Sequence, residues 1–330
     1  MIGEAVAQGV MKPMVTPLPT KPESLVTLQR ALRGSASRQN SERLIGWVLA
    51  ACGILSIFTT IGIVAVLIQQ AFEFFIDVSI WDFLTGTQWT ALFENDQQFG
   101  VLPLLAGTAM IAVLSMVVAI PLGLMAAIYL SEYASSRARS ILKPFMELLA
   151  GIPTIVYGYF ALTFITPKLL KPIIADIQVY NVLSAAIAVG IMVLPMVASL
   201  SEDSLRAVPR SLREAAYGLG ATKLEVSTQI VVPGAISGIV AAIILAVSRA
   251  VGETMIVALA AGSRTQLTAD PRESMQAMTG FIVQVVSGDV ERGSIIYKSL
   301  FAVGLLLFAL TLLMNIVSQW FVSRFREVYQ

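Results

Sequence analysis

Long uncharged stretches of apolar residues constrain the fold of this chain more than any other feature. They cover residues 44–72, 97–131, 148–167, 177–201 and 299–323, and a sixth stretch, 226–263, is interrupted only by Arg249 and Glu253. A helix needs about 20 apolar residues to cross roughly 30 Å of hydrocarbon, and each stretch can supply them. Soluble domains carry about 25% charged residues, whereas this chain has 13%. The sequence therefore predicts an integral membrane protein.

The apolar stretches predict an all-α fold with six membrane-spanning helices. In a bilayer the backbone polar groups must pair within the spanning segment, which a helix achieves by itself. The approximate cores of the predicted spans are 45–68, 103–129, 148–166, 181–200, 235–261 and 299–321.

Lysine and arginine are distributed unevenly among the segments that connect these spans. The tail, the 131–147 and 201–230 loops and the C-terminus hold fifteen of them, against five in the opposite set of loops. The loop at 73–98 has five acidic residues and no basic one. Because basic residues concentrate on the cytoplasmic side of membrane proteins, we expect both termini to be cytoplasmic.

The first 43 residues differ in composition from the rest of the chain. They are polar, contain four prolines and show no helical period. A segment of this kind cannot bury enough apolar surface to fold by itself. We therefore expect a disordered cytoplasmic tail over 1–43 and a single membrane domain over 44–330.

Aromatic residues at Trp81, Phe83, Trp89 and Phe93 predict a belt at the membrane interface.

Several functional classes are excluded by residues that the chain lacks. It has no histidine, the commonest general base and metal ligand. Its one cysteine, Cys52, lies in an apolar stretch, and no GxxxxGK[ST] loop for nucleotide phosphates is present. We expect no catalytic residue, no metal site and no cofactor. A net charge of +1 gives no reason to expect nucleic-acid binding.

The loop between the fourth and fifth spans, 201–233, carries helix-boundary signals in close succession. Ser211-x-x-Glu214 and Thr222-x-x-Glu225 are capping-box patterns. Gly218 and Gly220 are suited to end a helix. Leu212, Ala215, Ala216 and Leu219 recur at the spacing of one helix face. These signals predict a short amphipathic helix, a glycine turn and a second helix. From the residues alone, this first helix could lie at the lipid interface or contact a partner.

The segment Glu214-Ala215-Ala216-x3-Gly220-x9-Ile230-x2-Pro233 resembles the EAA signature of bacterial ABC importer permeases. The resemblance implies the ABC importer permease fold. In that family the loop forms a coupling helix that docks on the ATP-hydrolysing subunit. By resemblance, Glu214, Ala215, Ala216 and Gly220 take the coupling role here. A short rigid helix can pass the movement of an ATPase to the attached spans.

Arg249 and Glu253 are the two charges inside the predicted fifth span. A charge near the bilayer centre costs about 2.5–3.5 kcal/mol on insertion scales, so such residues face protein or water. Their i, i+4 spacing predicts one helix face, where they can pair with each other or bind substrate. A guanidinium suits an oxyanion. The carboxylate can accept a hydrogen bond from a ligand that keeps a proton, as phosphate does at neutral pH.

Further motifs narrow the resemblance to permeases of the high-affinity phosphate importer, and to its C-type subunit. They include Arg249-Ala-Val-Gly-Glu253-Thr, Gly151-Ile-Pro-Thr-Ile-Val-Tyr-Gly158 and Phe83-Leu-Thr-Gly-Thr-Gln-Trp89. The resemblance covers about 44–330. It implies a multi-pass subunit of the bacterial plasma (inner) membrane that is not itself an enzyme. Its implied partners are a second phosphate permease, two ATP-binding subunits, an extracytoplasmic phosphate-binding protein and membrane lipid.

Three alternatives stay open at the level of the sequence. A permease for another oxyanion, molybdate or sulfate, would share the same loop. A self-contained secondary transporter or channel would use Arg249 and Glu253 as an ion relay, but would leave the 201–233 loop unexplained. An intramembrane enzyme is disfavoured because histidine and clustered carboxylates are absent.

Overall fold

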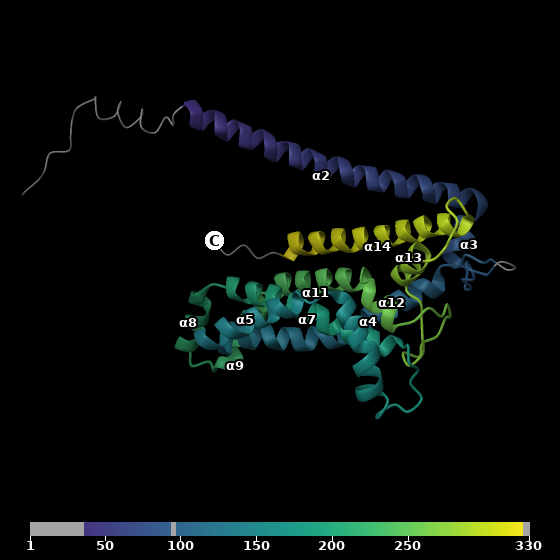
Figure 1. The fold of residues 1–330 in the computed structure, drawn as a ribbon. Helices are drawn as coiled ribbons and strands as arrows, with labels where there is room; N and C mark the ends of the chain where they lie inside the picture. Colours follow the sequence, from purple (N-terminus) through teal and green to yellow (C-terminus); the bar gives the residue numbers. More distant parts are fainter. Residues whose placement is uncertain (1–35, 94–96, 326–330) are drawn as a thin grey trace, which may run out of the picture. The chain divides into compact units, whose positions relative to one another are not determined.

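The computed structural model describes residues 36–93 and 97–325 (Figure 1). The chain divides by its internal contacts into two compact units, 1–64 and 65–330. Within the described ranges the secondary structure is helical, apart from one isolated antiparallel bridge between Trp89 and Phe99. The predicted all-α class is therefore confirmed.

The described part of the first unit belongs to one long helix, α2 (Ala36–Asp77), which continues into the second unit. Its large apolar side chains from Leu44 to Ile63 are exposed on every face, with Trp47 at 76% and Phe58 at 72% exposure. A helix that is apolar all round and exposed is suited to a lipid environment. Most of the predicted disordered tail, residues 1–35, lies outside the described residues, and α2 already begins at Ala36.

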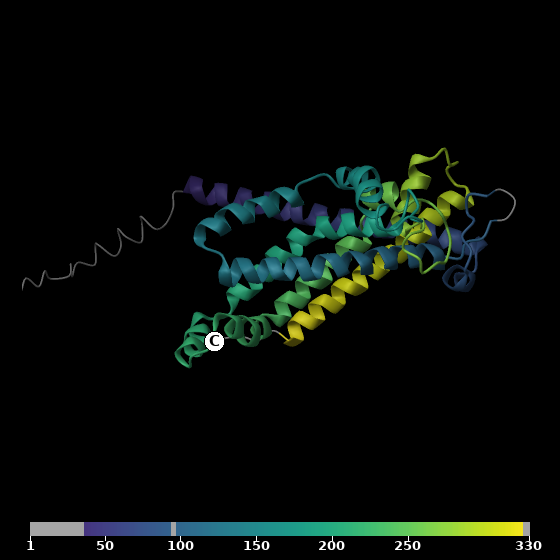
Figure 2. The ribbon, with the colours of Figure 1, turned by 90° about the horizontal axis from the view of Figure 1, so that it is seen from below.

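The second unit contains the remaining helices (Figures 1 and 2). Their bounds are α3 Ile80–Thr85, α4 Leu102–Ile128, η1 Tyr129–Tyr133, α5 Ser136–Ala150, α6 Thr154–Phe160, η2 Ala161–Leu170, α7 Val182–Ala207, α8 Arg210–Gly218, α9 Lys223–Val226, η3 Ser227–Val231, α10 Val232–Gly234, α11 Ile236–Val251, α12 Met255–Ala260, α13 Met278–Ser287 and α14 Ile295–Phe325. The three η elements are π-helical turns that continue or precede α-helices.

The centre of the second unit is the packing of α4 against α7, with α11 lying against both and against α14. Small residues allow the close approach of α4 and α7. A Cβ atom on Gly190 would lie 2.9 Å from the carbonyl oxygen of Ser115, so only glycine fits there without a shift. The core around this contact is aliphatic and includes Ile111, Val189 and Ala246. Membrane helices associate through such small-residue interfaces.

Four helices are long and apolar enough to cross a membrane, and two bent helix pairs raise the possible number to six. Two predicted spans are corrected in detail. The span predicted at 148–166 contains a sharp bend, because α5 and the helix over Thr154–Leu170 meet at 86° around Gly151 and Pro153. The span predicted at 235–261 is interrupted, because α11 ends at Val251 and α12 begins at Met255.

The second unit has two distinct ends. We call the end formed by η1, α5, α8, α9 and the last turn of α7 the coupling end. We call the other end, formed by α3, α13 and the segments 86–93, 97–101, 171–181 and 261–277, the loop end. There the segments are joined by backbone hydrogen bonds, such as Val182 N to the Glu273 oxygen at 3.0 Å.

The predicted aromatic belt is partly wrong. Phe83 and Trp89 are 1% and 2% exposed and pack with Phe74, Phe99 and Phe281 in the core of the loop end, whereas Trp81 and Phe93 are exposed. The antiparallel bridge between Trp89 and Phe99 brings segments 86–93 and 97–101 together, and these rings turn inward. Spacing along the sequence could not reveal this fold-back.

Candidate functional site

The helix boundaries of the predicted coupling segment are largely confirmed. Helix α8 ends at Gly218, and Gly220 follows with φ of +88°, a left-handed conformation that favours glycine. Thr222 then caps α9, accepting from the Glu225 amide while the Glu225 carboxylate accepts from the Thr222 amide at 2.7 Å. The chain therefore forms the expected helix, glycine turn and second helix.

The second predicted capping box, at Ser211 and Glu214, is not formed. Helix α8 begins two residues earlier than this box implies, at Arg210, with Pro209 in the N-cap position and no side-chain cap. Proline favours an extended conformation in the residue before it and presets a φ that suits the approach to a helix. Pro209 therefore fixes the start of the helix, and Ser211 falls inside it.

The small residues of α8 divide between two faces. Ala216 is buried and packs with Ala127, Leu205 and Val226 in the core of the coupling end. Glu214, Ala215 and Gly220 are exposed, as is Leu219 at 91%. Among the four residues predicted to couple, Ala216 thus holds the helix against its own bundle, and the other three lie on an accessible surface.

Arg213 fastens α8 to the rest of the coupling end. Its guanidinium donates to the carbonyl oxygens of Val208 at 2.6 Å and Leu205 at 2.8 Å, where α7 ends. It also pairs with the Glu132 carboxylate of η1 at 3.2 Å. A planar guanidinium can make these contacts together because its donors diverge in fixed directions. One side chain therefore links α8 to both α7 and η1.

Glu202, a residue that the sequence reasoning did not select, forms the centre of a charged cluster beside α8. It is fully buried on α7. Its carboxylate lies 3.3 Å from Arg139 Nε, 3.2 Å from Lys143 Nζ and 3.6 Å from Arg206 Nη1. The i, i+4 pair Glu202 and Arg206 is visible in the sequence, but the two α5 partners are about sixty residues away and only the fold brings them near.

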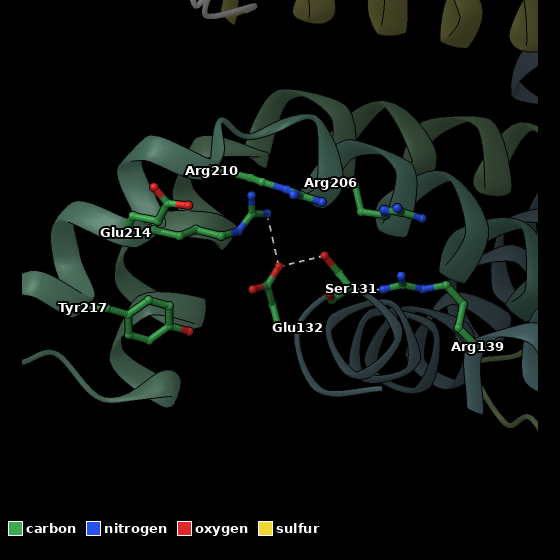
Figure 3. Close-up of a pocket in the computed structure, with 8 residues that line it drawn as sticks. Ser131, Glu132, Arg139, Arg206, Arg210, Glu214 and Tyr217 are labelled. Carbon is green, nitrogen blue, oxygen red and sulfur yellow. Dashed lines mark hydrogen bonds and ion pairs between the residues drawn. The ribbon is translucent and has the colours of Figure 1, made fainter. Parts of the chain in front are cut away.

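Two of the cations around Glu202, Arg139 and Arg206, border an open pocket at the coupling end (Figure 3). Its volume is about 350 Å³. The side chains come from η1, α5, α7 and α8, which are the segments that the basic-residue count assigns to the cytoplasmic side. The lining residues are Ser131, Glu132, Arg139, Arg206, Arg210, Arg213, Glu214 and Tyr217. Glu214, one of the residues predicted to couple, is therefore part of an arginine-rich site.

Arg249 and Glu253 lie on the two sides of the interruption between α11 and α12. Arg249 is in the last turn of α11, is exposed, and donates from Nε to the sulfur of Met192 on α7 at 3.2 Å. Glu253 is 8% exposed and its Oε1 accepts from the amides of Met255 at 3.1 Å and Ile256 at 3.3 Å. The two side chains form no ion pair with each other among the contacts of the described residues.

The interruption explains why the pairing expected from i, i+4 spacing does not form. The spacing argument assumed one continuous helix, but the Glu253 carboxylate caps the start of α12 instead, and Thr279 Oγ1 donates to the Glu253 backbone oxygen at 2.7 Å. Oε2 of Glu253 makes no hydrogen bond within the described part of the chain. An exposed guanidinium and a carboxylate with one unoccupied oxygen thus lie beside a break in a membrane helix.

The family model for the inner membrane component of binding-protein-dependent transport systems matches residues 119–327. This region contains the coupling end, both sides of the α11–α12 interruption and α14. The chain therefore belongs to the family of inner-membrane permease components of ABC importers, and it is a multi-pass protein of the bacterial inner membrane. Membership of this family favours an ABC importer permease over a self-contained transporter, a channel or an enzyme.

Curated relatives share this assignment over most of the chain. A probable ABC transporter permease, YqgH of Bacillus subtilis, is 30% identical over 92% of this chain and 97% of its own length. The phosphate transport system permease protein PstC of Mesorhizobium japonicum is 31% identical over 74% of this chain and 79% of its own length. PstC of Haemophilus influenzae is 29% identical over 74% and 82%.

Solved structures support the fold alone, because their sequences are distant. A bacterial ABC transporter involved in the import of alginate matches with a TM-score of 0.60 and 14% identity, over 88% of this chain and all of that one. An inward-facing structure of the MetNI methionine ABC transporter matches with a TM-score of 0.51 and 18% identity, over 68% of this chain and 93% of that one. The ABC importer permease fold expected from the sequence is confirmed.

Proposed function

We propose that this chain is a permease subunit of an ATP-driven importer of inorganic phosphate and contributes half of the translocation pathway. The observation that carries the proposal is the exposed Arg249 guanidinium beside the interrupted membrane helix. The similarity to PstC proteins points to the same substrate. YqgH is named only as a probable permease, and the solved structures concern alginate and methionine transporters, so they do not bear on the substrate.

Arg249 needs a polar environment that residues 36–93 and 97–325 do not supply. Met192 provides only a sulfur acceptor, which is weak for a charged donor. A charge at this depth has to face another protein or water. A second permease subunit that faces Arg249 across a hydrated pathway would meet this requirement. Arginine is well suited to bind a tetrahedral oxyanion there, because its fork can contact two oxygens.

Glu253 would act on the proton that phosphate retains at neutral pH. Oε1 is occupied by the α12 amides, which fixes the orientation of the carboxylate. Oε2 is left to accept a hydrogen bond from a phosphate hydroxyl. Fully ionised sulfate or molybdate has no such hydrogen and would meet a carboxylate of like charge. The pair therefore favours a protonated oxyanion over the two alternatives.

Coupling to ATP hydrolysis would pass through the exposed face of α8. Glu214, Ala215 and Gly220 would contact the ATP-binding subunit, while Ala216 and Arg213 transmit its movement to α7 and η1. The complete transporter would contain a second phosphate permease, two ATP-binding subunits and an extracytoplasmic phosphate-binding protein. ATP hydrolysis would take place on the partner subunits, and phosphate would cross unchanged.

Uptake by the reconstituted transporter tests the substrate assignment. We expect Arg249→Gln to lower phosphate uptake at least tenfold while the complex still assembles, and Glu253→Gln to weaken the preference for phosphate over sulfate. Thr228→Ala, at an exposed position of η3, is the control for reconstitution. Wild-type phosphate uptake by both Arg249→Gln and Glu253→Gln would contradict the proposal. Uptake of sulfate or molybdate in preference to phosphate would transfer the assignment to another oxyanion.

The subunits that co-purify in mild detergent test the proposed assembly. An ATPase and a second permease are expected with this chain. Glu214→Lys should reduce ATPase association, because it reverses a charge on the exposed face of α8. A homo-oligomer without an ATPase, or unchanged coupling in Glu214→Lys, would contradict the assignment of α8 as the coupling helix.

A further inference from the structure

The pocket at the coupling end has an excess of positive charge. Its wall contains four arginines and two glutamates. The acids nearest to the arginines are already engaged. Glu132 accepts from Ser131 Oγ at 2.8 Å and pairs with Arg213. Glu202, behind the wall, is shared by Arg139, Lys143 and Arg206. Because these two carboxylates are already paired, they do not neutralise the remaining arginine of the wall, Arg210.

Among the described residues, Arg210 is the arginine of the pocket wall that has no acidic partner. It is exposed and makes no ion pair or side-chain hydrogen bond within the described residues, and Glu214, one helical turn later, does not pair with it. Figure 3 shows the Glu214 carboxylate on the opposite side of the pocket from Arg139 and Arg206. An anion that entered the pocket would therefore meet Arg210 without having to displace an existing acidic partner.

The chemistry of the wall matches a tetrahedral oxyanion. Guanidinium groups bind phosphate oxygens in pairs and keep their charge at any physiological pH. Arg206 reaches Glu202 with only one nitrogen, at 3.6 Å, so it retains donors for a ligand. The hydroxyl of Tyr217 adds a neutral donor at the rim. A volume of about 350 Å³ accommodates a phosphate group together with a small esterifying group or water.

We propose that this pocket, lined by Arg139, Arg206, Arg210 and Tyr217, binds a phosphate group and thereby ties α8 to α5 and α7. One source of the phosphate group is free phosphate. This source rests on the proposed function, because imported phosphate would be released at the cytoplasmic side, where the coupling end is predicted to lie. A phospholipid headgroup is the other source of the same chemistry. Exposed apolar side chains on α5, at Ile141 and Phe145, could contact its acyl chains.

Hydrogen exchange of α8 in the purified complex tests the proposal, with nucleotide and binding protein left out. Maltoside micelles contain no phosphate group, so inorganic phosphate can be titrated against chloride at equal ionic strength. A second arm adds short-chain phosphatidylglycerol without free phosphate. At a ligand concentration ten times Kd, exchange of the α8 amides should slow about tenfold, because the ligand opposes opening of the helix.

Substitutions locate the effect in the pocket. Arg210→Gln and Arg206→Gln should each abolish the slowing, whereas Arg137→Gln, an exposed α5 residue outside the pocket, should retain it. Slowing by phosphate alone identifies free phosphate as the ligand, and slowing by phosphatidylglycerol alone identifies the headgroup. The proposal is overturned if neither arm slows exchange, or if slowing survives in both pocket variants.

The failure of this proposal can be told apart from failure of the proposed function. Arg249→Gln, which tests the substrate pathway, should leave the slowing of α8 exchange unchanged. A transporter that imports another oxyanion would lose the free-phosphate rationale but could still show protection by phosphatidylglycerol. Normal phosphate uptake with no protection in either arm would reject the pocket and keep the transport assignment.

Discussion

The coupling end and the loop end of the second unit are held together by different forces. At the coupling end, buried Glu202 is surrounded by Arg139, Lys143 and Arg206, and Arg213 links three elements through carbonyls and a carboxylate. At the loop end, aromatic rings meet edge to face, with Trp89 and Phe281 centroids 4.8 Å apart. A buried charge cluster thus distinguishes the coupling end, and a cluster of buried aromatic rings distinguishes the loop end.

The different interactions at the two ends suit different roles during transport. Ion pairs and hydrogen bonds can exchange partners when a neighbouring subunit moves, at a cost that salt reduces. Close-packed rings lose contact area as soon as they shift, so they resist displacement. We infer that the loop end is the fixed frame against which the coupling end moves.

Truncation of Phe281 should produce the largest effect on stability. The side chain is fully buried, and Phe281→Ala should cost about 3–5 kcal/mol of unfolding free energy through lost burial and an unfilled cavity. Thermal unfolding of the purified complex measures this loss, with Phe93→Ala as the control at a 65% exposed position in the same region. Equal losses in the two variants would show that the ring cluster does not stabilise the loop end.

Neutralisation of Glu202 should have a smaller effect that depends on salt. Glu202→Gln leaves three cations without their shared carboxylate, at a cost of about 1–3 kcal/mol because these cations keep some solvent contact. Unfolding at low and high ionic strength should show a smaller loss at high salt, unlike that of Phe281→Ala. Asp203→Asn, 61% exposed, should cost little. A salt-independent loss in Glu202→Gln would argue against an electrostatic coupling end.

Adding one methyl group at Gly220, in the turn after α8, should destabilise that turn. Gly220→Ala places a side chain at φ of +88°, where the backbone strain costs about 1–2 kcal/mol although no neighbour is within 4 Å. Hydrogen exchange at α8 and α9 should speed up by roughly tenfold. Gly218→Ala is the matched control, because alanine favours the helix there and should slow exchange. Acceleration in both variants would contradict a specific requirement at Gly220.

A surface ion pair at the loop end should give the smallest effect. Hydrogen bonds from the Arg272 side chain and backbone lower the pKa of Asp270 to about 2. A carboxyl group with a depressed folded-state pKa stabilises the fold above its unfolded pKa, about 3.9, and this contribution is lost as pH falls toward 2. Asp270→Asn should flatten the stability curve between these values. An unchanged acid limb in Asp270→Asn would show that the pair does not contribute.

The sequence predicted the membrane class, the helical fold and the short helix and glycine turn over 210–222 because each depends on local pattern. Apolar stretches, a capping box at Thr222 and a glycine at 220 act within a few residues. The Ser211 capping box failed because Pro209 fixed the helix start earlier. The pairing of Arg249 with Glu253 failed because helical spacing holds only while the helix is continuous.

Other features required contacts between segments far apart in the chain. The burial of Trp89 depends on Phe281, and the charge of Glu202 is balanced from α5. No local pattern indicates either contact, since both partners could as well be exposed. The arginine-rich pocket is missed for the same reason, because its wall combines η1, α5, α7 and α8.

The apolar stretches and many of the helix ends follow from local pattern, because hydrophobicity and backbone propensity are properties of neighbouring residues. The partners of the few charges follow instead from the packing of the helices. It capped α12 with Glu253, left Arg249 exposed and gathered four arginines around one pocket. Electrostatic energy depends on distance in space, and distance in space is fixed only when the helices pack.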